Sequence, residues 1–176
     1  GCGRYAALRV DPARLWRRLM EMAEIGATLS GGVHRLALSD EDRGARDLFR
    51  SWCDAAGLET TIDTLGNMLA RRTGTEDDAA PVLIGSHLDS QPMGGRFDGT
   101  LGVLAALEVV ETLNDEGVTT RHPIEVVNWT NEEGSRFSPA MVCSGVFAGV
   151  FELDYALQLA DANGFTMGDE LERIGY

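Results

Sequence analysis

The chain has 176 residues, a formal net charge of −13 and a calculated pI of about 4.5, with 44% hydrophobic and 24% charged residues. This length and composition are typical of one globular domain with a sizeable core. The acidic balance argues against a nucleic-acid partner and against binding to an anionic membrane surface.

Lysine and cysteine chemistry are also restricted. All fifteen basic residues are arginine, which excludes a Schiff-base lysine or a P-loop lysine in this stretch of chain. Cys2, Cys53 and Cys143 are widely separated, so neither a disulfide framework nor a thiolate zinc site is expected. His34 and His122 lie in polar, turn-like contexts and are expected at the surface. With no apolar run of 18 residues and no signal segment, we expect a cytoplasmic protein without a membrane partner.

The first half of the chain predicts two helices and then two strands. Asp11-Pro12 is typical of a helix start, and Ser39 followed by Asp42 resembles a weak capping box. Gly66-Asn67 is a turn signal between the two strands. The expected elements are helices from Asp11-Pro12 to about Ala23 and over 45–56, followed by strands over 58–63 and 68–71.

The second half alternates strands and helices. The apolar run 81–85 is bounded by turn residues, as in a strand covered on both faces. Strand, helix, strand, helix predicts βαβ units, and therefore an α/β fold with a mostly parallel or mixed sheet and flanking helices. The expected elements are strands over 81–85 and 123–129, and helices over 100–116, 140–150, 153–160 and 168–174.

Histidine and carboxylate side chains follow two of these strands. His87 and Asp89 come after the first βαβ strand, and the adjacent Glu132 and Glu133 come after the second. Ligands in open α/β sheets lie beyond the carboxyl ends of the strands, so the two segments should meet in space. One imidazole with several carboxylates suits a catalytic divalent-metal site.

Each residue of this group has an expected role. Asp89 lies two positions after His87, so in an extended segment both side chains project to the same side, and the carboxylate can hold the second imidazole nitrogen. Asp98 sits on a turn before a helix, where its two oxygens can bridge two ions about 3.5–4 Å apart. Glu132 and Glu133 should point to opposite sides of an extended segment, one to the metal and one to the substrate as general base.

Several segments carry a resemblance to a known family. The segment 85–105 begins Gly-Ser-His-Leu-Asp-Ser-Gln-Pro, and 131–137 reads Asn-Glu-Glu-Gly-Ser-Arg-Phe; 35–42 and 63–67 match as well. The chain resembles the M20-type dinuclear metallohydrolases of the aminoacylase and carboxypeptidase-G type. Within them it is most similar to the N-carbamoyl-L-amino-acid hydrolase, β-ureidopropionase and allantoate amidohydrolase group. The likeness extends over nearly the whole chain.

The resemblance implies a metal-dependent amidohydrolase. His87 would bind one ion, Asp98 would bridge both, and Glu133 would bind the second. Glu132 would be the general base, and Asp89 would orient His87. The cofactor would be two divalent ions, zinc or else manganese, cobalt or nickel. The substrate would be a small N-carbamoyl amino acid, of the L-α or β-alanine type, or a ureide, and hydrolysis would give an amino acid, ammonia and carbon dioxide.

The resemblance also implies a domain organisation. Residues 1–176 would be the N-terminal part of a dinuclear-metal, exopeptidase-like catalytic domain. The lid domain, the rest of the catalytic domain and further histidine ligands would lie outside this chain. The isolated 176-residue piece is therefore expected to be inactive, and the full-length protein is expected to be a homodimer.

Other functions stay open at this point. Allantoate amidohydrolase, or an M20-type peptidase or deacylase, would use the same residues on another substrate. A non-catalytic binding or assembly domain is a different class, and the intact Glu132 argues against it. A cysteine hydrolase acting through Cys143 is a third class, which predicts sensitivity to thiol reagents and indifference to chelators.

Overall fold

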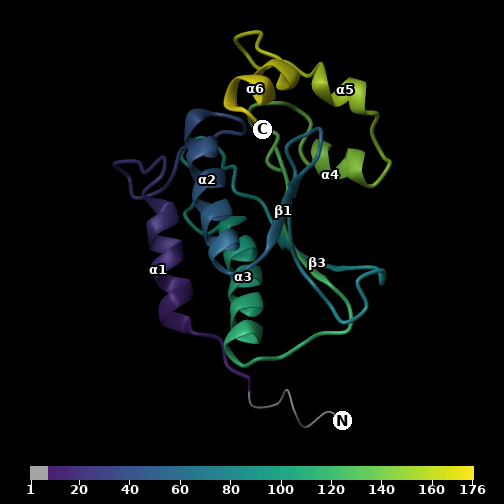
Figure 1. Cartoon of the computed structure of the whole chain (residues 1–176). Helices are drawn as coiled ribbons and strands as arrows, with labels where there is room; N and C mark the ends of the chain where they lie inside the picture. The colour runs from purple at the N-terminus through teal and green to yellow at the C-terminus, as the bar shows by residue number, and fades with distance from the viewer. Residues whose placement is uncertain (1–7) are drawn as a thin grey trace.

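The computed structural model describes residues 8–176 of the chain (Figure 1). Helices and strands alternate as the sequence predicts for an α/β protein. The helices are α1 (Pro12–Ala23), α2 (Asp40–Ala55), α3 (Thr100–Asp115), α4 (Val142–Phe147), α5 (Leu153–Leu157) and α6 (Met167–Ile174). The strands are β1 (Glu59–Ile62), β2 (Met68–Arg72), β3 (Val82–Ser86) and β4 (Ile124–Asn128).

The two predicted N-terminal helices are confirmed, and their capping residues act as expected. The Asp11 carboxylate accepts hydrogen bonds from the backbone N–H groups of Ala13 and Arg14, and Pro12 occupies the first helical position. At α2, the Ser39 hydroxyl accepts from the Asp42 N–H. The α2 helix begins at residue 40, five residues before the start expected from its apolar spacing.

The four strands form one mixed sheet in the order β1-β2-β4-β3. β1 and β2 are joined by a tight turn and pair antiparallel, and β2 also pairs antiparallel with β4. Only β3 and β4 are parallel, with Ile84 opposite Val126, because α3 makes the long crossover that parallel strands require. The mixed sheet is therefore confirmed, whereas a mostly parallel sheet is wrong.

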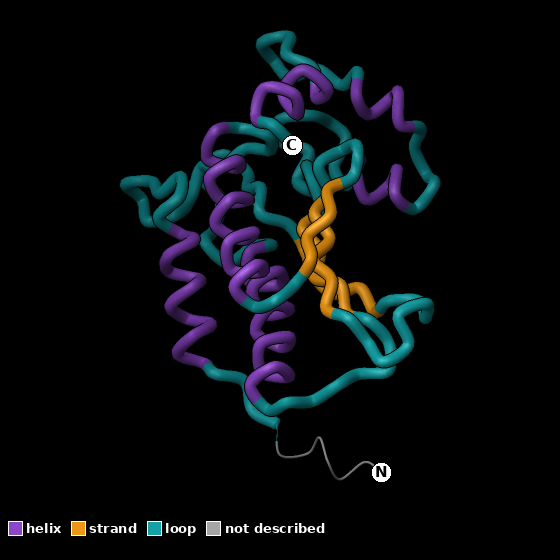
Figure 2. The backbone as a smooth tube through the Cα atoms, viewed as in Figure 1, coloured by secondary structure: helices purple, strands orange, loops and turns teal. Residues whose placement is uncertain are grey.

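β3 differs from the expectation of a strand covered on both faces. Within the described residues it is one of the two edge strands of the sheet, and Val82 and Leu83 are 51% and 37% exposed. Helices α1, α2 and α3 lie together on one side of the sheet, while α4, α5 and α6 lie beyond the end of the strands (Figures 1 and 2). The apolar character of a strand indicates burial on a face, and it does not say whether a further strand covers the edge.

The C-terminal helices are shorter than their sequence patterns suggest. α4 spans residues 142–147 and not 140–150, and α5 ends at Leu157 and not near residue 160. Instead of continuing the helix, Ala160 forms an isolated β-bridge with Thr166, which directly precedes α6. These helices enclose a second apolar cluster, which includes Phe137, Val142 and Leu171 and is separate from the main core under α1–α3.

The parallel pairing of β3 and β4 fixes where the site residues can lie. Both strands end at the same edge of the sheet, with Ser86 opposite Asn128. The segments after them therefore leave the sheet side by side, and the Leu88 N–H donates to the Asn128 side-chain oxygen, 2.9 Å away. No helix within residues 8–176 is long and apolar enough to span a membrane.

Candidate metal centre

His87 is the centre of the candidate site and lies one residue beyond β3. Its ring is buried, and Nδ1 lies 2.9 Å from the backbone oxygen of Asp89. A carbonyl can only accept, so Nδ1 carries a proton in this contact and Nε2 is left to bind another group. Gly99 packs against the ring: a Cβ at residue 99 would lie 2.4 Å from its Cε1 atom, so only glycine fits there.

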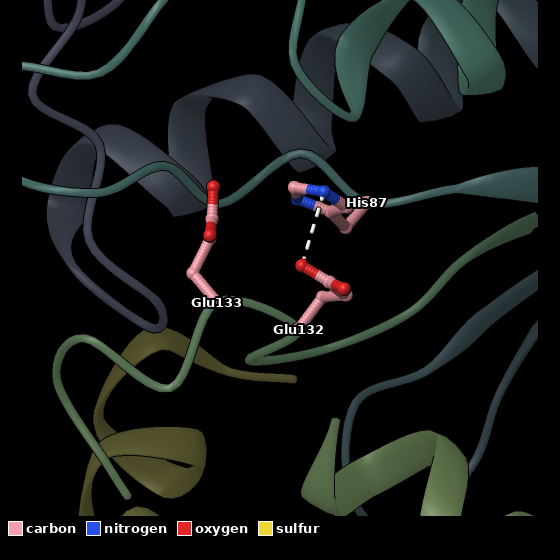
Figure 3. Close-up of side chains that lie close together, drawn as sticks. All are labelled: His87, Glu132 and Glu133. Atoms are coloured by element: carbon pink, nitrogen blue, oxygen red, sulfur yellow. Dashed lines mark ion pairs between the residues drawn. The ribbon is translucent and has the colours of Figure 1, made fainter. Parts of the chain in front are cut away.

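Glu132 and Glu133 both approach this imidazole (Figure 3). The Nε2 atom of His87 is 3.2 Å from Oε2 of Glu132. One ligand atom from each of His87, Glu132 and Glu133 lies within 4.8 Å of the other two. The expectation that the two glutamates point to opposite sides is therefore wrong. The backbone is not extended here: Asn131, with a positive φ of 51°, lies in a turn, and Glu132 and Glu133 lie in a bend.

Asp89 has a role that its spacing from His87 does not reveal. Its carboxylate oxygen lies 3.5 Å from His87 Nδ1, so the imidazole is held more closely by the backbone oxygen of residue 89. The two carboxylate oxygens instead accept from the backbone N–H groups of Glu132 and Glu133, each at 3.2 Å. Asp89 thus ties the segment after β3 to the segment after β4.

Asp98 is close to the site but does not join its centre. Its Oδ1 atom is 3.9 Å from Nε2 of His87, and its side chain is 67% exposed. It falls outside the three-residue group of His87, Glu132 and Glu133. It lies on the turn before α3, whereas the other residues follow the ends of β3 and β4. The role of a bridging ligand stays a prediction.

The site has an excess of negative charge. Burial opposes protonation of His87, but its contacts with Asp89 and the charges of Asp89 and Glu132 outweigh burial and raise the pKa of the imidazole to about 9. Burial raises the pKa of Glu133, and the charges of Asp98 and Asp89 add to this. In the part of the chain that the structure describes, Asp89, Asp98 and Glu132 form ion pairs with His87 alone, and Glu133 forms no ion pair.

This arrangement fits a divalent metal ion. An imidazole nitrogen and carboxylate oxygens are ligands that zinc and related ions accept, and they converge here at short range. Neighbouring carboxylates that lack a basic partner repel each other, and a metal cation would relieve that repulsion. The Gln91 side-chain amide donates to Oε2 of Glu133 at 3.1 Å, which orients this carboxylate.

The other reactive residues considered from the sequence lie away from this chemistry. His34 and His122 are exposed, as predicted. Cys143 is fully buried, with its Sγ 3.7 Å from Sδ of Met167, and burial raises the pKa of its thiol to about 12. A thiol in that environment is protonated at neutral pH and is a poor nucleophile, so the structure disfavours the cysteine hydrolase.

Asn67 and Arg46 support the second loop of the site, a role that their sequence context does not indicate. Asn67 Oδ1 accepts from the Thr130 N–H at 2.9 Å, and Arg46 donates to the Thr130 hydroxyl at 2.9 Å. Both side chains are buried. The turn signal at Gly66-Asn67 did not indicate these contacts with Thr130, because the contacts join residues more than sixty positions apart.

Comparison with known proteins gives a consistent result. The sequence profile described as peptidase family M20/M25/M40 matches residues 83–170, half of the chain. The chain is 58% identical over 168 residues to an N-carbamoyl-L-amino-acid amidohydrolase of Rhizobium meliloti, and 49% identical over 166 residues to one of Geobacillus stearothermophilus. These alignments cover 96% and 94% of this chain but 40% of each relative. The chain thus spans about 40% of the length of the curated relatives it matches.

A solved structure has the same fold. The crystal structure of an amidase of the hydantoinase/carbamoylase family from Burkholderia multivorans matches with a TM-score of 0.96 at 62% sequence identity. The match covers 97% of this chain and 41% of that chain. The mixed sheet and its helices therefore correspond to part of that larger fold.

Proposed function

Because the chain belongs to peptidase family M20/M25/M40, we propose that it is the metal-binding part of an amidohydrolase that acts on N-carbamoyl-L-amino acids. The observation that carries this proposal is the convergence of His87, Glu132 and Glu133 on one point beside Asp98. The similarity to two N-carbamoyl-L-amino-acid amidohydrolases supports the substrate class.

Two divalent ions are the proposed cofactor, zinc or else manganese, cobalt or nickel. His87 would hold one ion through Nε2, Glu133 would hold the other, and Asp98 would contribute to both. When bound, the ions would polarise the carbamoyl carbonyl and lower the pKa of a water molecule at the site. The hydrogen bond from His87 Nδ1 to the backbone oxygen of Asp89 keeps Nε2 available for this task.

Glu132 is the proposed general base. It would accept a proton from the attacking water and then deliver that proton to the nitrogen of the leaving group. Its backbone N–H is held by Asp89, and its carboxylate faces the imidazole edge, so it stands next to the proposed metal position. Addition of one water to the substrate then yields the amino acid, ammonia and carbon dioxide.

We further propose that residues 1–176 form the N-terminal part of the catalytic domain, with a lid domain and the rest of the catalytic domain supplied by further polypeptide. The lengths of the curated relatives support this, since the chain covers 40% of each. The piece alone would bind metal weakly and be inactive, and the protein as encoded would be a homodimer. Sedimentation analysis of both forms, with hydrolysis assays, tests these statements; efficient hydrolysis by the homogeneous 176-residue piece would contradict them.

The main experiment measures metal content and chelator-reversible hydrolysis on the protein as encoded. N-carbamoyl-L-amino acids, N-carbamoyl-β-alanine and allantoate are the substrates to compare. We expect about two divalent ions per chain and hydrolysis of the N-carbamoyl-L-amino acids that is lost in chelator and restored by metal. Preference for allantoate would indicate an allantoate amidohydrolase instead. Absence of both metal and hydrolysis would contradict the proposal.

A further inference from the structure

Arg35 is a completely buried cation next to the candidate metal centre. It lies between α1 and α2 and is 1% exposed. Its guanidinium donates to the backbone oxygens of Leu88 at 2.7 Å, Met22 at 3.1 Å and Ile25 at 2.8 Å, and to the Thr100 hydroxyl at 3.1 Å. Among the described residues no carboxylate forms an ion pair with it. Burying a cation against neutral acceptors is costly, so this position calls for an explanation beyond stability.

Two of the four acceptors of the Arg35 guanidinium, Leu88 and Thr100, belong to segments that carry proposed metal ligands, while the other two lie at the end of α1. Leu88 lies between His87 and Asp89, and Thr100 is the first residue of α3, two positions after Asp98. The main chain of residue 35 adds two bonds to the first segment: its N–H donates to the Ser90 hydroxyl at 2.9 Å, and its oxygen accepts from the Ser90 N–H at 2.7 Å. One planar guanidinium therefore joins the loop after β3 to the start of α3.

Arg46 provides an instructive contrast. It is equally buried and contacts the other loop of the site through Thr130. Its guanidinium, however, forms an ion pair with Asp42 at 3.1 Å, so its charge is compensated locally. For Arg35 the acidic groups that act on its charge are Asp42 and Asp89, neither of them in ion-pair contact. Asp89 is a residue of the site, so the charge of Arg35 interacts with the site as well as with Asp42.

We propose that Arg35 is a positioning residue of the metal centre, which holds the His87–Asp89 loop and the Asp98 turn at the separation needed for metal binding. This rests on the metal site of the proposed function. Without the guanidinium, the Leu88 oxygen and the Thr100 hydroxyl lose a shared donor, and the two ligand segments can move apart. Residues that orient metal ligands typically alter metal affinity by about 10- to 100-fold when they are replaced.

The test compares metal affinity in variants of the protein as encoded. Zinc dissociation constants are measured by competition with a chromophoric chelator for the wild type, Arg35→Met, Arg35→Lys and the control Arg18→Met. Arg18 is a buried arginine that bonds Glu111 on α3 and contacts none of the ligand loops. We expect the dissociation constant to rise about 10- to 100-fold in Arg35→Met, less in Arg35→Lys, and not at all in Arg18→Met.

A purely structural role gives a different result. It would lower the melting temperature in Arg35→Met and Arg18→Met alike and leave zinc affinity unchanged in both, which would overturn the inference. If Arg35→Met does not fold, Thr100→Val provides a milder test, because it removes only one acceptor of the guanidinium. Zinc binding should still weaken several-fold in Thr100→Val. An unchanged zinc affinity in this variant would also overturn the inference. Activity of the Arg35 variants should recover in excess zinc.

The outcome for Arg35 can be separated from the outcome for the proposed function. If the wild type binds zinc but hydrolyses no carbamoyl substrate, the substrate proposal fails, and the zinc titrations still decide the role of Arg35. If the wild type hydrolyses the substrates and Arg35→Met keeps the wild-type zinc affinity, only the inference on Arg35 fails. A wild type that binds no metal would overturn both.

Discussion

Two clusters of acidic residues lie within this small chain and differ in how their charge is balanced. The arginine-paired acids are Asp40 at the start of α2, Glu170 within α6 and Asp161 in the segment before α6. Arg136 contacts Asp161 at 3.0 Å and Glu170 at 2.6 Å, while Arg173 contacts Asp40 at 2.6 Å and Glu170 at 2.9 Å. The metal-site acids are Asp89, Asp98, Glu132 and Glu133. The first three share the His87 imidazole as their ion-pair partner, and Glu133 has no ion-pair partner among the described residues.

The pKa of Glu133 at the metal site and the pKa values of Asp40 and Glu170 move in opposite directions. The Arg173 guanidinium holds the pKa of Asp40 and of Glu170 below the ordinary range. At the metal site, burial and neighbouring carboxylates raise the pKa of Glu133. The charge of the first cluster is therefore balanced within the fold, whereas an added cation would relieve the repulsion in the second. A group of acids that the fold leaves without basic partners indicates a binding site, whereas acids matched with arginines indicate structure.

The largest effect should come from the proposed base. In Glu132→Gln, the amide cannot accept the proton of the attacking water, so we expect kcat to fall by about 10²- to 10⁴-fold. Metal content should be retained, because His87, Asp98 and Glu133 are intact. Steady-state kinetics with N-carbamoyl-L-amino acids and elemental analysis measure the two quantities. Glu172→Gln, an exposed acid on α6, serves as control; equal activity in both variants would favour a non-catalytic domain.

The metal-site acids should make stability depend on metal. A ligand that binds only the folded state at a concentration 100 times its dissociation constant stabilises by about 2.7 kcal/mol. We expect an increase of this size in the free energy of unfolding when zinc is added to the chelated protein at that excess. His87→Ala should lose most of the gain, and His122→Ala, which alters an exposed histidine, should keep it. Urea unfolding with and without zinc measures the effect, and equal gains in the two variants would contradict a site at His87.

The arginine-paired acids should matter for stability without any metal. Glu170→Gln weakens charged hydrogen bonds to Arg136 and Arg173 in a buried setting, so we expect a loss of about 2 kcal/mol in the free energy of unfolding. The loss should be the same with zinc or chelator, and Glu172→Gln should lose little. A zinc-dependent loss would show that the two clusters are coupled.

The ion pairs of Glu170 with Arg136 and Arg173 should also make the free energy of unfolding depend on pH. Because the folded state lowers the pKa of Glu170, its ion pairs stabilise the protein above the pKa of the unfolded chain and are lost as pH falls through the folded value. The unfolding free energy should therefore decrease from pH 5 downward and decrease less steeply in Glu170→Gln. Equal slopes for the two proteins in acid would contradict this assignment.

The smallest effect concerns Glu133 in the chelated protein. Its pKa is raised in the folded state, so its favourable contribution is present below the unfolded pKa and is lost as pH rises through the folded value. At pH 7, Glu133→Gln should therefore raise the melting temperature slightly in chelator, and the gain should disappear near pH 4. In the presence of zinc, Glu133→Gln should instead have a lower melting temperature than the wild type, because the variant lacks a metal ligand. A lower melting temperature in chelator at pH 7 would show that the carboxylate is not strained there.

The amino-acid sequence by itself determined the parts of this protein that depend on neighbouring residues. The caps at Asp11 and Ser39 and the apolar periodicity placed the main helices, and the short apolar runs placed the strands. The strand ends also located His87, Asp89 and the Glu132-Glu133 pair, because parallel strands joined by one helix must end at the same edge.

Only the tertiary structure decided the contacts between distant segments. The order of the strands, the open edge at β3 and the bond from Asp89 to the glutamate N–H groups depend on long-range pairing, which local patterns do not encode. Residues 130–133 form a turn and bend in which both glutamates approach His87, although alternation along an extended strand predicts opposite directions. Arg35 and Arg46 look like ordinary charged residues in the sequence, and only packing shows that they are buried behind the site. Burial and partner choice are properties of the whole fold, so these features could not be predicted from the sequence.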